Sequence, residues 1–380
     1  MAARLLRPSV NCLKAPKAKA QPTGVGAHRC YTSPATPPTS PFAPRHLLSI
    51  ADLTPQELTQ LVRNAASHKA AVKSATDHAL PMVAALPHHL QDSLTGHTIA
   101  ALFTKRSTRT RVSTEAAITM LGGHPMFLGA QDIQLGVNES LYDTSLVLSS
   151  MVSALVARVD AHADVADLAK HSSKPVINAL SDAFHPLQTL ADYLTLHEAF
   201  ATAQTAHQPT LGLAGLKLAW VGDANNVLFD LAIGAAKLGC DIAVATPPGY
   251  GIPAPMRDLI HAAAPPSNPS FRIHETHVPE EAVKAADVIA TDTWVSMGQE
   301  ADKAARLRDF AGFQVTRELA RRGGAREGWR FLHCLPRKPE EVSDEVFYSP
   351  ASLVFQEAEN RLWGMLAALE GFVVNQGRIV

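Results

Sequence analysis

Short apolar runs alternate with helix-like segments along most of this chain, and this alternation limits the fold more than any other feature. In the first half, strand-like runs cover 97–103, 154–159 and 175–180, and helical patterns cover 108–121, 140–151, 163–171 and 186–200. Strands that alternate with helices favour a parallel sheet with helices on both faces. An earlier helix is predicted to open at residues 54–57, where a cap, a proline and a capping-box glutamate follow one another.

A second alternation follows residues 201–215, which we predict to be a hinge or a surface excursion. Its strands are predicted at 216–222, 241–246, 271–275, 287–292, 313–316 and 330–335, and its helices at 226–238, 254–264, 279–286, 300–310 and 355–373. We therefore predict an α/β protein with two doubly wound parallel-sheet domains joined by helices. The active site is expected in the interdomain cleft, because such sheets bind ligands at the carboxyl ends of their strands.

The length and the charge of the chain restrict its partners. Its 380 residues suffice for two domains of ordinary size. The apolar content of 46% suits a globular protein, and no uninterrupted apolar stretch approaches the ~20 residues of a membrane helix. A net charge of −1 argues against nucleic-acid binding through a bulk electrostatic field. We thus expect neither a membrane nor a nucleic acid as partner.

The N-terminal segment differs from the rest of the chain in charge. Residues 1–44 contain no Asp or Glu, and residues 1–31 hold six of the 34 lysines and arginines. A basic, acid-free segment with Ser and Thr is typical of an organellar transit peptide, and residues 29–32 resemble a mitochondrial processing site. We predict a transit peptide over 1–31, a linker over 32–44 and a location in the mitochondrial matrix. A disordered basic tail is the alternative.

A strongly basic segment, Lys105-Arg-Ser-Thr-Arg-Thr-Arg111, lies at a predicted strand-to-helix turn. The first N–H groups of a helix have no partner within the helix and attract anions. Ser107, Thr108 and Thr110 add neutral donors, and Arg109 can form two parallel hydrogen bonds to one anion. We predict a phosphate site, although the segment matches neither a Walker loop nor GxGxxG. A solvated basic surface is the alternative.

Two further polar positions follow predicted strands of the first domain. Arg158 lies in the run 154–159, and a buried arginine needs a partner, which is either a ligand or an internal carboxylate. His185-Pro-Leu-Gln188 opens a helix and places His185 and Gln188 on one face. These side chains can polarise a carbonyl and hold an amide, or His185 can serve as a cap or a core residue.

Three polar segments follow predicted strands of the second domain. Residues 222–226 lie where a dinucleotide loop would, but only one of the three required glycines is present, so Asn225 and Asn226 better suit an amino-acid carboxylate. Asp292-Thr-Trp-Val-Ser-Met-Gly298 enters a loop. Cys334, in His333-Cys-Leu-Pro-Arg337, is either an ordinary buried thiol or a thiol polarised by its neighbours.

Metal binding is not indicated by the cysteines and histidines. Cys12 and Cys30 lie in the predicted transit peptide, and Cys240 and Cys334 are too isolated for a disulfide framework or a zinc site. None of the 17 histidines shows paired ligand spacing beside an acidic residue. We therefore expect no metal.

Six segments together resemble the ornithine carbamoyltransferases of the aspartate/ornithine transcarbamoylase family. They are Ser-Thr-Arg-Thr-Arg at 107–111, Gln-Asp-Ile-Gln-Leu-Gly-Val-Asn-Glu-Ser at 131–140, His-Pro-Leu-Gln at 185–188, Asp-Thr-Trp-Val-Ser-Met-Gly at 292–298, His-Cys-Leu-Pro-Arg-Lys-Pro at 333–339 and Glu-Ala-Glu-Asn-Arg at 357–361. The first and third are shared by the wider family. Ser-Met-Gly and His-Cys-Leu-Pro-Arg are specific to the ornithine enzymes, and the match is close to the mitochondrial members.

The resemblance implies carbamoyl transfer from carbamoyl phosphate to the δ-amine of L-ornithine, which gives L-citrulline and phosphate in arginine biosynthesis and the urea cycle. It implies no cofactor and no metal. The implied catalytic residues are Cys334, Arg158 and His185. The residues implied to bind carbamoyl phosphate are Ser107, Thr108, Arg109, Thr110, Gln134, Arg158, His185, Gln188, Cys334, Leu335 and Arg361. Those implied to bind L-ornithine are Asn226, Asp292, Ser296 and Met297.

The resemblance also implies an assembly and domain limits. Family members are homotrimers with sites between subunits, so Gln134 would reach the phosphate bound by a neighbouring chain. The implied limits are 45–190 for the carbamoyl phosphate-binding domain, 191–354 for the ornithine-binding domain and 355–380 for a C-terminal helix that returns to the first domain. Cys334, with the main-chain carbonyl of Leu335, would take up the δ-amine proton, and Asp292 would tune the thiol.

Two other functions fit these segments less well. A transcarbamoylase for another amine or amino acid, such as putrescine, N-acetylornithine or aspartate, is disfavoured by Asp292 and residues 296–298. A catalytically idle paralogue with a binding or regulatory role is disfavoured because Arg109, His185 and Cys334 are intact.

The transit-peptide hypothesis predicts that the basic segment is removed after import. Mass spectrometry of the protein from native cells should find a mature N-terminus near Tyr31. A version that lacks residues 1–31 should remain outside the organelle. An organellar protein that still carries Met1–Tyr31 would contradict the hypothesis.

Overall fold

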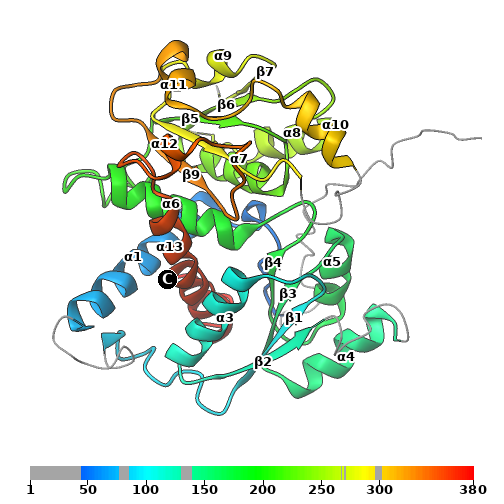
Figure 1. Cartoon of the computed structure of the whole chain (residues 1–380). Coiled ribbons are helices and arrows are strands. Elements are labelled where there is room, and N and C mark those ends of the chain that lie inside the picture. Colours follow the sequence, from blue (N-terminus) through cyan, green and yellow to red (C-terminus); the bar gives the residue numbers. More distant parts are fainter. Residues whose placement is uncertain (1–43, 77–84, 130–138, 267, 269–270, 296–301) are drawn as a thin grey trace, which may run out of the picture. The chain divides into compact units, whose positions relative to one another are not determined.

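The computed structural model describes residues 44–76, 85–129, 139–266, 268, 271–295 and 302–380, which belong to one compact unit (Figure 1). The predicted transit peptide lies outside these residues, and so do Gln134, Ser296 and Met297. Within the described ranges, no helix combines the length and the apolar composition that crossing a membrane requires.

The first sheet, counted over the described residues, has four parallel strands in the order β2-β1-β3-β4. The strands are β1 (Thr98–Phe103), β2 (His124–Gly129), β3 (Ala154–Arg158) and β4 (Val176–Leu180). The sequence predicts all of these except β2. This strand lies at the edge of the sheet, is partly exposed and carries a proline at its second position, a residue that argues against a strand in the sequence.

Apart from one 3-10 turn, the helices of this half match the sequence patterns. They are η1 (Ile50–Asp52, a 3-10 turn), α1 (Pro55–Thr76), α3 (Thr108–Met120), α4 (Leu141–Met151), α5 (His162–His171) and α6 (Pro186–Phe200). The predicted capping box at the start of α1 is confirmed. Glu57 N donates to Thr54 Oγ1 at 3.2 Å, and Thr54 N donates to the Glu57 carboxylate at 2.8 Å.

The second sheet has five parallel strands in the order β7-β6-β5-β8-β9 in the described part of the chain. The strands are β5 (Lys217–Val221), β6 (Asp241–Ala245), β7 (Ile273–Thr276), β8 (Val288–Thr291) and β9 (Arg330–His333). The predicted strand at 313–316 is wrong, because only an isolated bridge joins Val315 to Val342 there. The run is apolar because Phe313 and Val315 pack into the core with Phe310.

Two helices of this half are not predicted from the sequence, α11 (Arg317–Gly323) and α12 (Asp344–Phe347). Helix α11 is rich in charged residues and α12 has only four residues, so neither shows an apolar period. The helices are α7 (Asn226–Leu238), α8 (Ala254–Ala262), α9 (Pro279–Val283), α10 (Lys303–Asp309), α11 (Arg317–Gly323), α12 (Asp344–Phe347), α13 (Val354–Leu369) and the π-helical turn η3 (Glu370–Val374).

The strand order reverses once in each sheet, between β1 and β3 and between β5 and β8. Doubly wound sheets bind ligands at the carboxyl ends of the strands at such points. Phe103 and Arg158 are neighbours in register at the ends of β1 and β3. Val221 and Thr291 end β5 and β8, and the Thr291 hydroxyl donates to the Val221 carbonyl. Residues predicted for the site follow these ends in both sheets.

Helix α13 packs against helices of the first half. It contacts α1, α3 and α6, as Figure 1 shows for the dark red helix. A Cβ at Gly364 would lie 3.2 Å from the Leu190 Cβ on α6, so glycine permits the close approach of the two helices. The chain segment that follows the second sheet is therefore in contact with helices that surround the first.

A buried carboxylate on α7 joins two other segments of the chain. Asp230 Oδ1 accepts from Ser49 Oγ at 2.8 Å and from Ile50 N at 2.9 Å. Asp230 Oδ2 accepts from His185 N at 2.8 Å, at the N-terminus of α6. This carboxylate fixes the position where the predicted His-Pro-Leu-Gln segment begins.

We predict that Asp230→Asn destabilises the fold. The substitution keeps the shape of the side chain but turns an acceptor into a donor, which then faces a donor group of Ser49, Ile50 or His185. An unsatisfied buried polar group costs ~1–3 kcal/mol, so the free energy of unfolding in urea should fall by about 2 kcal/mol. Asp241→Asn, the same change at an exposed residue of β6, should lower it by less than ~0.5 kcal/mol. Equal effects of the two substitutions would contradict this role.

Candidate active site

The turn between β1 and α3 combines backbone and side-chain donors. Ser107 is the N-cap of α3, and its hydroxyl accepts from the Thr110 N–H at 3.3 Å. Thr108 is the first residue of the helix, and Thr110 is buried. The N-terminal N–H groups of this 13-residue helix and the three hydroxyls suit an anion.

The cations of this turn have different surroundings. Lys105 and Arg111 form ion pairs with carboxylates on the surface. Arg109 forms no ion pair among the described residues, and its Nη2 donates to the Leu335 carbonyl at 2.7 Å. The alternative of a solvated basic surface therefore fits Lys105 and Arg111 but not Arg109.

Arg158 ends β3 and is buried. It forms no ion pair with a carboxylate in the described part of the chain, and its Nε has no hydrogen-bond partner there. Burial lowers the pKa of its guanidinium to about 10, so Arg158 still carries its charge at neutral pH. The internal salt bridge considered from the sequence is absent among these residues, and an anionic or carbonyl ligand is the remaining candidate partner.

His185 is buried at the N-terminus of α6. Its side chain makes no capping hydrogen bond, and its Nδ1 has no partner among the described residues. Burial lowers the pKa of His185 well below 6.5, and the nearby charges of Arg361 and Arg158 lower it further. The imidazole is therefore neutral at physiological pH and can donate one hydrogen bond without adding charge.

Arg361 reaches these residues from α13. Its Nη1 donates to Gln188 Oε1 at 2.7 Å, and its Nη2 donates to Thr110 Oγ1 at 3.2 Å. The side chain is buried, and its Nε has no partner within the described residues. Burial lowers the pKa of Arg361 to about 10. Arg361 is thus in direct contact with Gln188 and Thr110, and the three residues come from three separate predicted segments.

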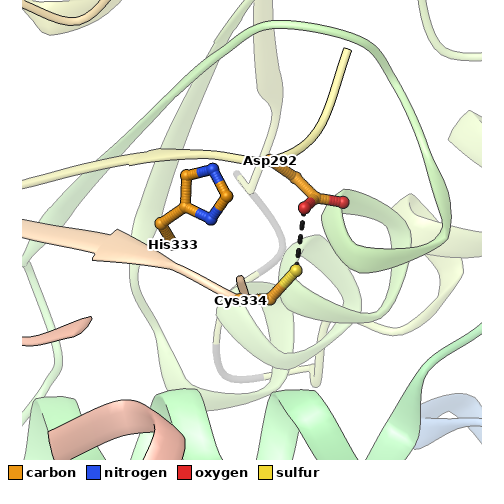
Figure 2. A group of neighbouring side chains, drawn as sticks. All are labelled: Asp292, His333 and Cys334. Atoms are coloured by element: carbon orange, nitrogen blue, oxygen red, sulfur yellow. Dashed lines mark hydrogen bonds between the residues drawn. The ribbon is translucent and has the colours of Figure 1, made fainter. Parts of the chain in front are cut away.

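An acid and a thiol follow β8 and β9 and face one another (Figure 2). Cys334 Sγ donates to Asp292 Oδ1 at 2.8 Å. Burial, followed by the charge of Asp292, raises the pKa of the Cys334 thiol well above its ordinary value. The sulfur is therefore a protonated donor that interacts with a neighbouring carboxylate.

The two asparagines at the start of α7 have separate partners. Asn226 Nδ2 donates to the Ser181 carbonyl at 2.6 Å. Asn225 caps α7 through its side-chain oxygen, and its Nδ2 donates to Asp292 Oδ2 at 2.7 Å. Both asparagines are candidates from the sequence, but only Asn226 is expected in the site. The contact of Asn225 with Asp292 was missed because it joins two strand ends that lie far apart in the sequence.

Asp292, His333 and Cys334 place three possible metal ligands within 4.8 Å of one another (Figure 2). Both ring nitrogens of His333 are already engaged, however. Nδ1 accepts from Leu335 N at 2.9 Å, and Nε2 contacts the Glu341 carboxylate at 3.1 Å. An imidazole that binds a metal must offer a lone pair. This set of side chains therefore fits a metal ion poorly.

The described contacts join the two predicted halves of the site. Arg109 from the first half binds the carbonyl of Leu335, which lies 3.8 Å from the Cys334 sulfur in the second half. Gln134, Ser296 and Met297 are outside the described residues, so the structure does not place them.

Two family models match the chain. The carbamoyl-P binding domain of aspartate/ornithine carbamoyltransferase matches residues 45–198, which contain the first sheet. The Asp/Orn binding domain of the same family matches residues 214–371, which contain the second sheet and α13.

Curated relatives and a solved structure agree with this match. The mitochondrial ornithine carbamoyltransferase of Emericella nidulans is 65% identical over 351 residues, which are 92% of this chain and 95% of that protein. The ornithine carbamoyltransferase of Saccharomyces cerevisiae is 45% identical over 342 residues, which are 90% and 98% of the two chains. The crystal structure of a mitochondrial ornithine carbamoyltransferase from Coccidioides immitis is 61% identical, with a TM-score of 0.81, and covers 89% of this chain and 100% of that chain. The resemblance of the six segments is confirmed, and this chain belongs to the aspartate/ornithine carbamoyltransferase family.

Proposed function

We propose that this chain transfers the carbamoyl group of carbamoyl phosphate to the δ-amine of L-ornithine, giving L-citrulline and phosphate for arginine biosynthesis and the urea cycle. The observation that carries the proposal is a group of donors that includes two buried guanidiniums, Arg158 and Arg361, and a neutral imidazole, His185. The relatives named as ornithine carbamoyltransferases support ornithine as the acceptor.

Carbamoyl phosphate is held at the N-terminus of α3 in this proposal. The helical N–H groups and the hydroxyls of Ser107, Thr108 and Thr110 suit the phosphate oxygens, and Arg109 neutralises the departing dianion. Gln134 of a neighbouring chain adds a further phosphate contact. Around the carbamoyl end, the residues proposed to bind it are Arg158, His185, Gln188, Cys334, Leu335 and Arg361.

The chemistry needs donors where negative charge develops. Attack by the δ-nitrogen forms an N–C bond and places charge on the carbamoyl oxygen, toward which Thr110, Arg158 and His185 offer hydrogen bonds. A preorganised donor of this kind is worth ~3–4 kcal/mol. The C–O bond to phosphate then breaks, the phosphate leaves with the electron pair, and the second proton of the attacking nitrogen passes to it. Because both reactants are held in line, this scheme uses no covalent enzyme intermediate, no cofactor and no metal.

The second half of the site handles ornithine and its proton. The residues proposed to bind ornithine are Asn226, Asp292, Ser296 and Met297. The δ-ammonium must lose a proton before it attacks. Because Cys334 is a thiol that donates to Asp292, we infer a relay, in which the sulfur accepts the ammonium proton as its own proton passes to the carboxylate. The Leu335 carbonyl orients the amine.

We also propose the domain limits 45–190, 191–354 and 355–380 and a homotrimer. Contact of α13 with α3 and α6 supports the return of the last segment to the first domain. Exposed apolar side chains on α4 support contact with another copy of the chain, since exposed apolar patches often mark interaction sites. They are Tyr142, Leu146, Val147 and Met151.

The proposed location is the mitochondrial matrix, with residues 1–31 as the import signal. Relatives named as mitochondrial support this location. The absence of acidic residues from the first 44 positions supports the assignment of the import signal.

A citrulline assay tests the proposed reaction directly. The purified protein should form citrulline from carbamoyl phosphate and L-ornithine. With putrescine, N-acetylornithine or aspartate, carbamoyl transfer should be at least ~100-fold slower, because groups that bind the α-ammonium and carboxylate are left unpaired or clash. A protein that forms no citrulline would overturn the proposal.

We predict that Arg109→Gln abolishes most of the turnover without unfolding the protein. Loss of the guanidinium removes a charged donor from the leaving phosphate, so kcat/KM for carbamoyl phosphate should fall by at least ~100-fold. Arg111→Gln is the matched control, because Arg111 pairs with Glu115 and stacks on Phe127, with its guanidinium 3.7 Å from the ring centroid. It should stay within about threefold of the wild type. Comparable losses in both variants would remove Arg109 from the site.

We predict that Cys334→Ser lowers kcat and changes the alkaline pH profile. The δ-amine resembles lysine, with a reference pKa of ~10.4, so activity at limiting ornithine should rise above neutral pH. A serine hydroxyl is intrinsically a far weaker acid than a thiol, so the relay should slow by about 10- to 100-fold. Serine keeps a hydrogen-bonding group at this position, so carbamoyl phosphate affinity should change little.

Cys240→Ser is the control for this substitution, because Cys240 is a buried thiol that donates to the Leu213 carbonyl at 3.3 Å. Its pH profile should match that of the wild type. If Cys334→Ser keeps both the rate and the pH profile, the proton leaves through Asp292 or water instead.

A further inference from the structure

Two buried carboxyls adjoin the proposed carbamoyl phosphate site and have no role in the scheme above. Asp192 lies on α6 and is 3% exposed, and Glu357 lies on α13 and is 2% exposed. Neither forms an ion pair among the described residues. Acidic residues are almost never fully buried unless they are paired, so their presence here needs a reason.

Helical spacing brings these carboxyls to two residues of the site. Gln188 and Asp192 are four positions apart on α6, and Glu357 and Arg361 are four positions apart on α13, so each pair shares a face of its helix. The two helices pack against each other (Figure 1). All four side chains therefore meet at one place.

The hydrogen bonds among them fix the side-chain amide of Gln188 in one orientation. Its Nε2 donates to Asp192 Oδ1 and to Glu357 Oε1, both at 2.8 Å. Its Oε1 accepts from Arg361 Nη1 at 2.7 Å. A guanidinium can only donate. Turning the amide over would therefore set its amino group against the Arg361 donor and remove both hydrogen bonds to the carboxyls.

Burial disfavours the charged form of both carboxyls. It raises the pKa of Asp192 to about 7 and that of Glu357 well above its ordinary value. The nearby positive charge of Arg361 lowers the pKa of Asp192 and offsets part of the cost of its burial. The oxygens that face Gln188 accept from its amide in the structure.

We propose that Asp192 and Glu357 are positioning residues that hold Gln188 with its oxygen toward Arg361 and the carbamoyl group, and that this orientation selects a carbamoyl over an acetyl phosphate. The inference rests on the proposed function and deepens it. Oε1 has a second lone pair, which can accept from the carbamoyl amino group. The methyl group of acetyl phosphate has a similar size but no donor, so a polar group of the site is left unpaired.

Glu357→Gln tests the proposal without a change in side-chain size. The oxygens of Glu357 accept from Gln188 and, at 2.9 Å, from the backbone N–H of His333. A glutamine has one oxygen, so it turns a donor toward one of these two groups. Calorimetry should show carbamoyl phosphate affinity falling about 10- to 100-fold, with acetyl phosphate and inorganic phosphate changing less than about threefold. KM for carbamoyl phosphate should rise by a factor similar to the loss of affinity.

Thr195→Val is the matched control for packing between α6 and α13. The Thr195 hydroxyl is buried and accepts from Asn360 on α13 at 2.8 Å, without contact to Gln188. This variant should lose stability but keep the wild-type ratio of carbamoyl to acetyl phosphate affinity. Thermal unfolding of all variants reports any loss of packing.

Two substitutions of the other carboxyl keep the test decisive if Glu357→Gln does not fold. Asp192→Leu removes the acceptor with a side chain of similar volume and should lose the same selectivity. Asp192→Asn keeps an oxygen that can accept from Gln188. It should therefore retain more of the selectivity than Asp192→Leu.

A selective loss of carbamoyl phosphate affinity supports the proposal. If the affinities for carbamoyl and acetyl phosphate fall equally, or if their ratio matches that of Thr195→Val, the proposal is overturned. The carboxyls then have a structural role only. Binding is measured without ornithine, so this result does not depend on turnover. A wild-type protein that prefers carbamoyl phosphate but forms no citrulline would overturn the proposed function alone.

Discussion

Burying the charges of Arg158 and Arg361 is the physical constraint on which the rest of the site depends. A buried guanidinium without a full set of partners costs several kcal/mol, and each of these has an Nε without a partner among the described residues. Burial keeps His185 neutral, and the charges of these two arginines lower its pKa further. The charge of Arg361 also lowers the pKa of Asp192, against the larger effect of burial, which raises it. An anionic substrate would neutralise the positive charges of these guanidiniums, so the site is suited to a negatively charged ligand.

Contacts between distant segments hold this charged group in place. Asp230 on α7 fixes the backbone of His185, and Arg109 donates to the carbonyl of Leu335, which follows β9. Each contact joins a residue near the first sheet to a residue of the segment that forms the second. A shift of either segment would therefore displace hydrogen-bond donors of the site. Such precise placement is what a mechanism based on hydrogen-bond donors and alignment demands, since a displacement of ~1 Å can cost ~100-fold in rate.

Most helices and strands, and the polar residues at strand ends, can be predicted from the sequence. This is because apolar periodicity, helix caps and turn residues depend only on positions that are close together in the chain. These local signals were misleading where an apolar run packs against a core residue, as Phe313 does against Phe310, and where an edge strand carries a proline. The resemblance supplied Arg361, which no local pattern marks as part of the site. Contacts such as Asn225 with Asp292 depend on how separate strands are aligned, and one sequence does not record that alignment.

The position of α13 in the chain has a consequence for the order in which the protein becomes competent to bind. Residues 107–110 and Gln188 are made early, but Arg361 and Glu357 follow both sheets in the sequence. A partly folded chain in which α13 has not yet docked would therefore lack Arg361 in the anion site and Glu357 beside Gln188. A chain whose α13 has not docked therefore offers carbamoyl phosphate a weaker site than the native protein does. Once α13 docks, the ligand binds the native state and shifts the equilibrium further toward it. Binding therefore acts as a late check that the chain has been assembled in full.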